Sequence, residues 1–159
     1  MGPDEQAIRH GVSELIAEAA ERIDGDRLED WAELFTDPCR YLIIDRAAHE
    51  AGMRQGIMYA ATKGMLLDRV FTIRNANLFE PHRYRHVIGQ VRLKGVEAGT
   101  AVVHSPFIAA RIMQTGETTL FATGRYLDKI NISGPEYRFT ERIVVLDSDR
   151  IDTLLAIPL

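Results

Sequence analysis

The sequence predicts an α+β fold in which amino-terminal helices pack on one face of a curved, mostly antiparallel sheet. Helical periodicity dominates the chain up to about residue 75, and long extended stretches fill it from about residue 80 onward. The links between the extended stretches are too short for crossover helices, so neighbouring strands should run antiparallel. Segregated helices and strands are typical of the α+β class, and a sheet bent around helices forms a cone that can hold a pocket at its mouth.

The composition is that of an ordinary globular protein. The chain has 159 residues, of which 46% are hydrophobic and 26% charged, and no repeat or linker marks a second unit. We therefore predict one domain over residues 1–159, with a helical part at about 1–75 and a sheet part at about 80–159.

Charge and cysteine content narrow the classes of function. The net charge of −4 gives no field that attracts phosphate backbones, so no nucleic-acid partner is expected. No apolar run approaches the roughly 20 residues needed to cross a bilayer, so no membrane association is expected. The single cysteine, Cys39, cannot form an internal disulfide, and no amino-terminal signal peptide is recognisable. A cytoplasmic location is therefore expected.

Two helices are predicted at the start of the chain. Residues 4–23 place apolar side chains three and four positions apart, which is the spacing of an amphipathic helix. Asp26, followed three positions later by Glu29, resembles a capping box that starts a second helix. This helix is expected to continue through Phe35 and to end at Pro38.

Two short strands and a third helix are predicted next. Residues 39–45 and 57–60 read as strands, and the polar residues 46–56 between them read as a loop. Thr62 is suited to cap the third helix. The apolar positions of this helix share one face and are Met65, Leu66, Val70 and Ile73.

The second half of the chain is predicted to form a meander of long strands. Short polar turns separate the extended stretches, which is typical of hairpin connections. The predicted strands are Tyr84 to Leu93, Val102 to Gln114, Thr118 to Ile130, Tyr137 to Leu146 and Ile151 to Ile157.

A basic stretch joins the helical part to the sheet. Pro81 prevents the helical half from continuing, and two arginines and two histidines fall within the five positions that follow it. Such a density of cationic groups requires carboxylate partners, either within this chain or on another chain. The candidates are Arg83, Arg85 and His86, with Arg69 and Arg74 nearby in the predicted third helix.

Histidine spacing gives little support for a metal site. His82 and His86 are four residues apart, a spacing that chelates a metal when both lie on one helical face. An extended chain after Pro81 would instead separate their Cα atoms by about 13 Å, at roughly 3.3 Å per residue. Hydrogen-bonded histidines in an ion-pair network are the favoured interpretation, and no metal site is predicted.

Acid–base chemistry in the cone is an open alternative. Residues of suitable type that strands could bring to a pocket are Tyr41, Asp45, His49, His86, His104, Tyr126 and Asp128. Strand alternation puts Leu120, Ala122, Gly124, Tyr126 and Asp128 on one face. If Asp128 is buried there, its pKa is raised and it can act as a base. The favoured interpretation is an ordinary surface carboxylate at the end of a strand.

Several motifs together resemble the small (beta) subunit of Rieske-type aromatic-ring-hydroxylating dioxygenases. The resemblance rests on Phe79–His86, Gly124–Asp128 and the ending Ile151–Leu159, and it spans nearly the whole chain. Within that family the sequence is most similar to small subunits acting on aromatic carboxylates, of the terephthalate and salicylate types, which have counterparts of Met65–Arg69 and Met113–Glu117. The resemblance implies a cone-shaped, cystatin/NTF2-like fold, shared with nuclear transport factor 2 and scytalone dehydratase.

The resemblance also implies the role of the chain. In this family a Rieske 2Fe-2S cluster and a mononuclear iron lie in the large (alpha) subunit, electrons come from NADH through a reductase, and three large and three small subunits form a hexamer. A Rieske cluster needs two cysteines and two histidines, and the single cysteine of this chain cannot supply them. The resemblance assigns no catalytic residue to this chain, which would hold large subunits in place and associate with its own copies as a trimer.

The basic stretch then has two interpretations. Arg83, Arg85 and His86 either pair with acidic groups of a neighbouring subunit or form an internal network that braces the junction. Two other classes of function also stay open. One is a stand-alone dehydratase or isomerase of the same cone fold, which requires an enclosed pocket where two polar groups converge. The other is an NTF2-like binding module.

Overall fold

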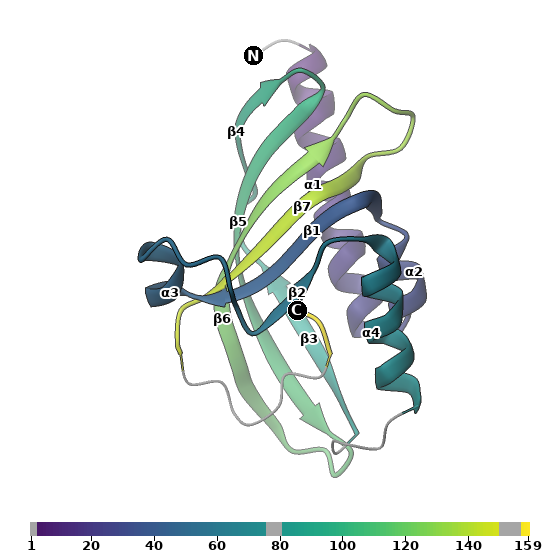
Figure 1. The fold of residues 1–159 in the computed structure, drawn as a ribbon, viewed down its shortest axis with the longest axis vertical. Coiled ribbons are helices and arrows are strands. Elements are labelled where there is room, and N and C mark those ends of the chain that lie inside the picture. The colour runs from purple at the N-terminus through teal and green to yellow at the C-terminus, as the bar shows by residue number, and fades with distance from the viewer. Residues whose placement is uncertain (1–2, 76–80, 150–156) are drawn as a thin grey trace.

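The protein is a cone of helices and strands (Figure 1). This computed structural model describes residues 3–75, 81–149 and 157–159. In chain order, the elements are α1 (Pro3–Asp24), α2 (Leu28–Ala32), β1 (Phe35–Asp45), α3 (Arg46–Glu50), β2 (Met58–Ala60), α4 (Lys63–Asn75), β3 (His82–Ile88), β4 (Arg92–Glu97), β5 (Thr100–Met113), β6 (Thr118–Asn131) and β7 (Arg138–Leu146). No helix within these ranges is long and apolar enough to cross a membrane.

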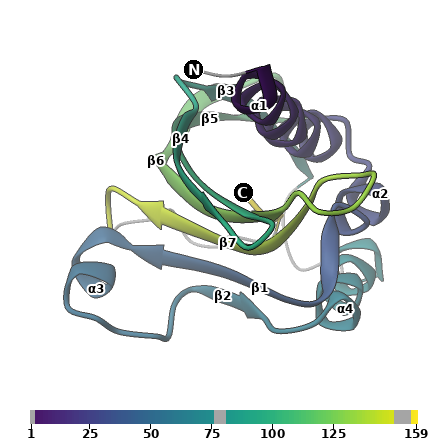
Figure 2. The same ribbon diagram turned by 90° about the horizontal axis from the view of Figure 1, so that it is seen from above.

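The strands form one curved, mostly antiparallel sheet, which confirms the predicted fold class. Its order is β2-β1-β7-β6-β5-β3, with β4 also paired to β5, and among the described strands only β1 and β7 run parallel. Figure 2 shows the sheet curling around the interior, with α1 lying along the open side. The helix and the concave face of the sheet thus enclose the core between them.

The first helix forms as predicted and fills the cone. Its apolar positions Val12, Ile16 and Ala19 recur every three to four residues and are fully buried. They share one core with Trp31, and with residues from the inner face of every long strand. Burial of this helical face, rather than intrinsic helix propensity, is the main source of its stability.

The second helix is much shorter than predicted. It ends at Ala32, and Phe35 already belongs to β1. Phe35 pairs with Phe139 of β7, whose N–H donates to the Leu34 carbonyl at 2.9 Å, so sheet pairing replaces helical bonds here. The predicted capping box is also wrong: Arg27 occupies the N-cap position without a side-chain bond.

Two further local predictions can be compared with the structure. The predicted loop at 46–56 contains the short helix α3, because the Asp45 side chain caps it by accepting from the Ala48 N–H at 2.8 Å. The predicted Thr62 cap of α4 is confirmed by a bond from the Met65 N–H to Thr62 Oγ1 at 3.1 Å.

The strand predicted over Tyr84 to Leu93 is two strands. Strand β3 already starts at His82, and both it and β4 pair with the single long strand β5, one with each half. The chain leaves the ladder between them, after the Gly89 N–H donates to the Pro106 carbonyl at 2.8 Å. The predicted strand Ile151 to Ile157 lies almost wholly outside the described residues.

A β-bulge changes one predicted face of β6. Ala109 pairs with Ala122 and Ala110 with Leu120, which leaves Phe121 as the extra residue. Phe121 turns inward and stacks on Tyr84 with ring centroids 5.4 Å apart. Leu120, predicted to share the face of Ala122, points outward and is 66% exposed.

Candidate functional site

The basic stretch lines a groove at one end of the cone. The groove has a volume of about 620 Å³ and is built from the ends of α1 and α4 and from strands β3 and β5. Alternation along β3 points Tyr84 and His86 into the core and Arg83 and Arg85 to the exposed face. Three of the five predicted cationic candidates line this groove: Arg74, Arg83 and Arg85.

His86 takes part in an internal brace. Its ring Nδ1 lies 2.6 Å from Asp24 Oδ1, and its backbone N–H donates to Asp24 Oδ2 at 2.8 Å. The His86 side chain is fully buried and that of Asp24 nearly so. The Arg85 guanidinium lies 4.0 Å from the same carboxylate, but its side chain is 73% exposed. Asp24 thus ties the end of α1 to the edge strand of the sheet.

Arg74 also has partners within the chain. Its Nε and Nη2 donate to the two carboxylate oxygens of Glu29 at 3.0 and 3.1 Å, and its Nη1 donates to Asp26 Oδ1 at 2.8 Å. The hydrogen bond from Arg74 lowers the pKa of Glu29. We call these ion pairs of Arg74 with Glu29 and Asp26 the clasp. Arg69 does not take part in the clasp and lines a second groove, between β2 and α4.

Three of the five pocket candidates meet inside the cone. Tyr41, Tyr126 and Asp128 are all buried, whereas Asp45 caps α3 and His104 alternates with buried Val103 and Ser105 on β5. Burial, with Lys94 and Arg125 nearby, lowers the pKa of His104. The structure therefore does not bring all five candidates to one place.

Asp128 is held by an arginine that the sequence analysis did not single out. Arg142, its partner across the β6–β7 ladder, donates from Nε and Nη2 to the two Asp128 oxygens at 2.9 and 3.1 Å. The guanidinium also stacks over Tyr126, 3.6 Å from the ring centroid. Asp128 is therefore not the surface carboxylate that was favoured. The signal that would have revealed the pair is an arginine at an inward position of β7.

This pairing limits what Asp128 can do chemically. Burial raises the pKa of its carboxyl, and the Arg142 guanidinium opposes that rise. A carboxylate that accepts two hydrogen bonds from one arginine has both oxygens engaged, so it is poorly placed to abstract a proton. Burial also raises the pKa of Tyr41 well above its usual value.

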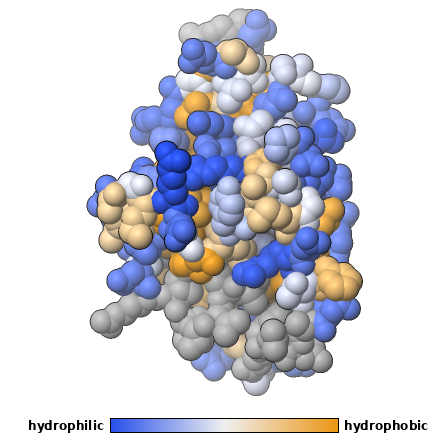
Figure 3. All heavy atoms as spheres, in the orientation of Figure 1, coloured by the Kyte–Doolittle hydropathy of each residue, from blue (hydrophilic) through white to orange (hydrophobic). Residues whose placement is uncertain are grey.

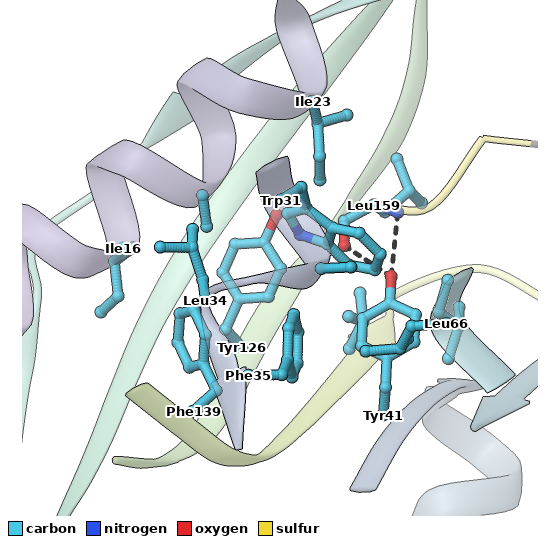
Figure 4. Close-up of a cluster of buried hydrophobic side chains, with 14 of the residues drawn as sticks. Ile16, Ile23, Trp31, Leu34, Phe35, Tyr41, Leu66, Tyr126, Phe139 and Leu159 are labelled. Carbon is cyan, nitrogen blue, oxygen red and sulfur yellow. Dashed lines mark hydrogen bonds between the residues drawn. The ribbon is translucent and has the colours of Figure 1, made fainter. Parts of the chain in front are cut away.

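Leu159, at the end of the described chain, lies in the buried cluster beside Tyr41 (Figure 4). The Tyr41 hydroxyl donates to the Leu159 carbonyl at 2.8 Å and accepts from the Leu159 N–H at 3.0 Å. The Tyr84 hydroxyl donates to the Ile157 carbonyl at 3.2 Å. Leu159 is completely buried, so these tyrosines bind the chain itself.

The histidines, cysteine and carboxylates do not form a metal cluster in the ranges 3–75, 81–149 and 157–159. No three of them lie close enough there to hold a metal ion. His86 already engages Asp24, and Cys39, the one cysteine of the chain, is buried. The residues of this chain do not fit a Rieske cluster, which needs two cysteines and two histidines.

The cone and its filled interior define an NTF2-like protein whose described residues show no open acid–base centre. The chain belongs to the ring-hydroxylating beta subunit family, because the model of that family matches residues 18–153. It is 43% identical over 148 residues to a terephthalate 1,2-dioxygenase terminal oxygenase component subunit beta from Comamonas, covering 93% of this chain and 96% of the relative. It is 32% identical to the anthranilate 1,2-dioxygenase small subunit of Burkholderia cepacia, over 86% and 85% of the two chains.

Solved structures agree with this family. The beta subunit of a protein described as an aromatic-ring-hydroxylating dioxygenase from Novosphingobium aromaticivorans matches with a TM-score of 0.89 and 35% identity, over 98% of this chain and 99% of that one. A protein described as scytalone dehydratase, from the same organism, matches with a TM-score of 0.75 at 14% identity, over 99% and 95%, which shows a shared fold alone. The resemblance to dioxygenase small subunits of the aromatic-carboxylate type is confirmed, and the chain is a beta subunit of a multicomponent ring-hydroxylating dioxygenase.

Proposed function

We propose that this chain holds the catalytic large subunits of an aromatic-ring-hydroxylating dioxygenase in a hexamer of three large and three small subunits. The observation that carries the proposal is the filled cone of a family member: Asp128 is bound by Arg142, and Tyr41 by Leu159. We take residues 1–159 as one NTF2-like domain, since described helices and strands share one core. The complex would act in the cytoplasm.

The chemistry of the complex would belong to the partner. A Rieske 2Fe-2S cluster and a mononuclear iron in the large subunit would carry electrons from NADH to oxygen, which is then inserted into the aromatic ring. Aromatic carboxylates are the substrate class to test first, because the relatives named above are called terephthalate and anthranilate dioxygenases. The small subunit would contribute only the positioning of the large subunits.

The convex face of the sheet is suited to contact between copies of the small subunit. Val87 and Ile108 are cross-strand partners on β3 and β5, and both are exposed together with Leu120 on β6. An exposed apolar patch of this kind is typical of a protein interface. We assign it to the trimer of small subunits.

Arg83 and Arg85 are the cations of the basic stretch best placed to meet another subunit. Both are exposed, whereas His86 and Arg74 are already engaged within the chain. Arg83 and Arg85 would add charge complementarity at the rim of the interface, which mainly sets specificity and rate of association. His86 and Arg74 would act indirectly, by fixing the strand and helix that present this rim.

Co-expression with the cognate large subunit tests the proposal. The expected result is a complex of hexamer mass that contains iron, while the small subunit alone contains none. Arg85→Ala should weaken assembly and leave the melting temperature of the isolated small subunit unchanged. If the small subunit does not bind the large subunit, the proposal is wrong. If Arg85→Ala instead lowers the melting temperature with assembly intact, Arg85 belongs to the internal brace.

A further inference from the structure

A second groove lies between β2 and α4, away from the basic stretch. It has a volume of about 390 Å³, and the exposed side chains of Ile57, Tyr59 and Met65 form much of its apolar wall. Positions 65, 68, 69 and 72 of α4 face it, which is one stripe of a helix. Hydrophobic and hydrophilic side chains lie side by side on this face of the molecule (Figure 3).

The part of the chain that builds this groove is rich in exposed apolar side chains. Of the ten large hydrophobic residues that are exposed in the described chain, six fall between positions 53 and 71. They are Met53, Ile57, Tyr59, Met65, Leu67 and Phe71. Three of them, Ile57, Tyr59 and Met65, line the groove itself, and apolar side chains gathered at a groove indicate a contact surface.

Strand β2 is one end of the sheet, and no other described strand pairs with its second edge. At the opposite end, the Asp24 carboxylate accepts the His86 N–H of edge strand β3. Such a capped N–H cannot pair with an added strand. Because β2 lies at the groove, its edge can accept the backbone of an extended segment there.

Asp68 and Arg69 are the charged residues that line the groove, and Arg69 is its cation. The other cations at the ends of α4 are engaged: Lys63 with Glu33 at 3.2 Å, and Arg74 with Asp26 and Glu29. The Nε of Arg69 is buried and has no hydrogen-bond partner among the described residues. A guanidinium held in this state is suited to bind a carboxylate from outside the chain.

We propose that the groove between β2 and α4 receives an extended segment of the large subunit, which adds its backbone to β2 and places a carboxylate on Arg69. An apolar side chain of the same segment would pack against Tyr59 and Met65. This inference rests on the proposed function, and it names the part of the small subunit that the large subunit contacts.

A second copy of this chain fits the groove less well. The other edge strands it could offer are basic: β3 carries Arg83 and Arg85 with no carboxylate, and β4 carries Arg92 and Lys94 with only Glu97. Cations on the incoming strand would repel Arg69. The convex apolar patch of Val87, Ile108 and Leu120, on different strands, leaves a separate surface for contacts between copies.

Dissociation of the complex on dilution tests this assignment. Variants Arg69→Glu and Tyr59→Asp are each co-expressed with the cognate large subunit, and mass photometry gives the concentration at which the purified complex falls apart. Each variant should raise this concentration at least tenfold, because each removes one of the two side-chain contacts. Arg92→Glu, which makes the same charge change at exposed β4, is the matched control and should leave it unchanged.

Hydrogen exchange locates the contact independently. Amides of residues 57–61 and 65–72 should exchange at least tenfold more slowly in the wild-type complex than in the free small subunit. Wild-type binding with unaltered dissociation of both variants would overturn the inference and leave the proposed function intact. The same holds if Arg69→Glu disrupts only the association of small subunits, since the occupant would then be a second copy. Failure of the wild-type chain to bind the large subunit would overturn both.

Discussion

Arg142 carries a buried charge that is paired with Asp128 inside the cone. Its side chain is almost completely buried, binds both oxygens of Asp128, and stacks on Tyr126 and Phe139. A buried ion pair contributes little net stability, because desolvation offsets the attraction between the charges. Loss of one partner is different, since it leaves the other charge buried without compensation.

Replacement of Asp128 should therefore be severe. We expect Asp128→Asn to lower the free energy of unfolding by about 3–5 kcal/mol, measured by urea denaturation. The double variant Asp128→Leu/Arg142→Met removes both charges at similar volume and should recover most of that loss. A single variant that costs under about 1 kcal/mol would show that Arg142 finds another partner.

Among the secondary-structure elements, α4 is fastened to the core by its buried face and to α2 by a charged clasp. Leu66 and Val70 are the buried positions, and Arg74 in the last turn reaches Glu29 and Asp26. The Glu29 side chain is half exposed, so the clasp is worth less than a buried pair. Its main effect is to hold the carboxyl end of α4 beside the basic groove.

The clasp should make stability depend on pH. The pKa of Glu29 is lowered in the folded protein from its usual 4.5, so folding favours the ionised carboxylate. This contribution is fully present above about pH 4.5 and is lost as pH falls through the lowered pKa. We expect Glu29→Gln to lower the free energy of unfolding at pH 7 by under about 1 kcal/mol and to have no effect once the carboxylate is protonated.

Urea unfolding of both proteins between pH 7 and pH 3 measures this difference. Glu14→Gln, at an exposed position of α1, is the control and should follow the wild type throughout. A stability difference for Glu29→Gln that is the same at both ends of the range would contradict an electrostatic role for the clasp.

For the whole molecule, the decisive contact is between the end of the chain and the interior of the cone. Tyr41 and Tyr84 come from different strands, and their hydroxyls meet the backbone at Leu159 and Ile157. These bonds anchor residues 157–159 against the strands that carry Tyr41 and Tyr84. One fold can carry different functions, so what fills the interior matters more for function than the fold does.

Removal of the Tyr41 hydroxyl tests this anchoring. Tyr41→Phe should lower the free energy of unfolding by about 1–3 kcal/mol, because the buried N–H and C=O of Leu159 lose their partner. Thermal and urea unfolding measure the effect. Tyr59→Phe serves as the control, since Tyr59 is 51% exposed and its hydroxyl should be neutral to remove. Equal stability of both variants would mean that Leu159 is held by packing alone.

Local patterns in the sequence were sufficient for much of this architecture. The spacing of Val12, Ile16 and Ala19 predicted α1, Thr62 predicted the start of α4, and short polar turns predicted antiparallel strands. The resemblance carried by motifs along the chain identified the family. Each of these signals lies within a few residues of the structure it specifies, so it can be read without knowledge of the fold.

Only the tertiary structure determined which polar side chains become partners. His86 meets Asp24 from 62 positions away, and Arg142 meets Asp128 only after β6 and β7 pair in register. Phe35 was predicted to be helical but lies in a strand, because it pairs with β7. The bulge at Phe121 places the Leu120 side chain on the face opposite to the predicted one. Propensity is worth less than about 1 kcal/mol per residue, so pairing and burial across the fold override it.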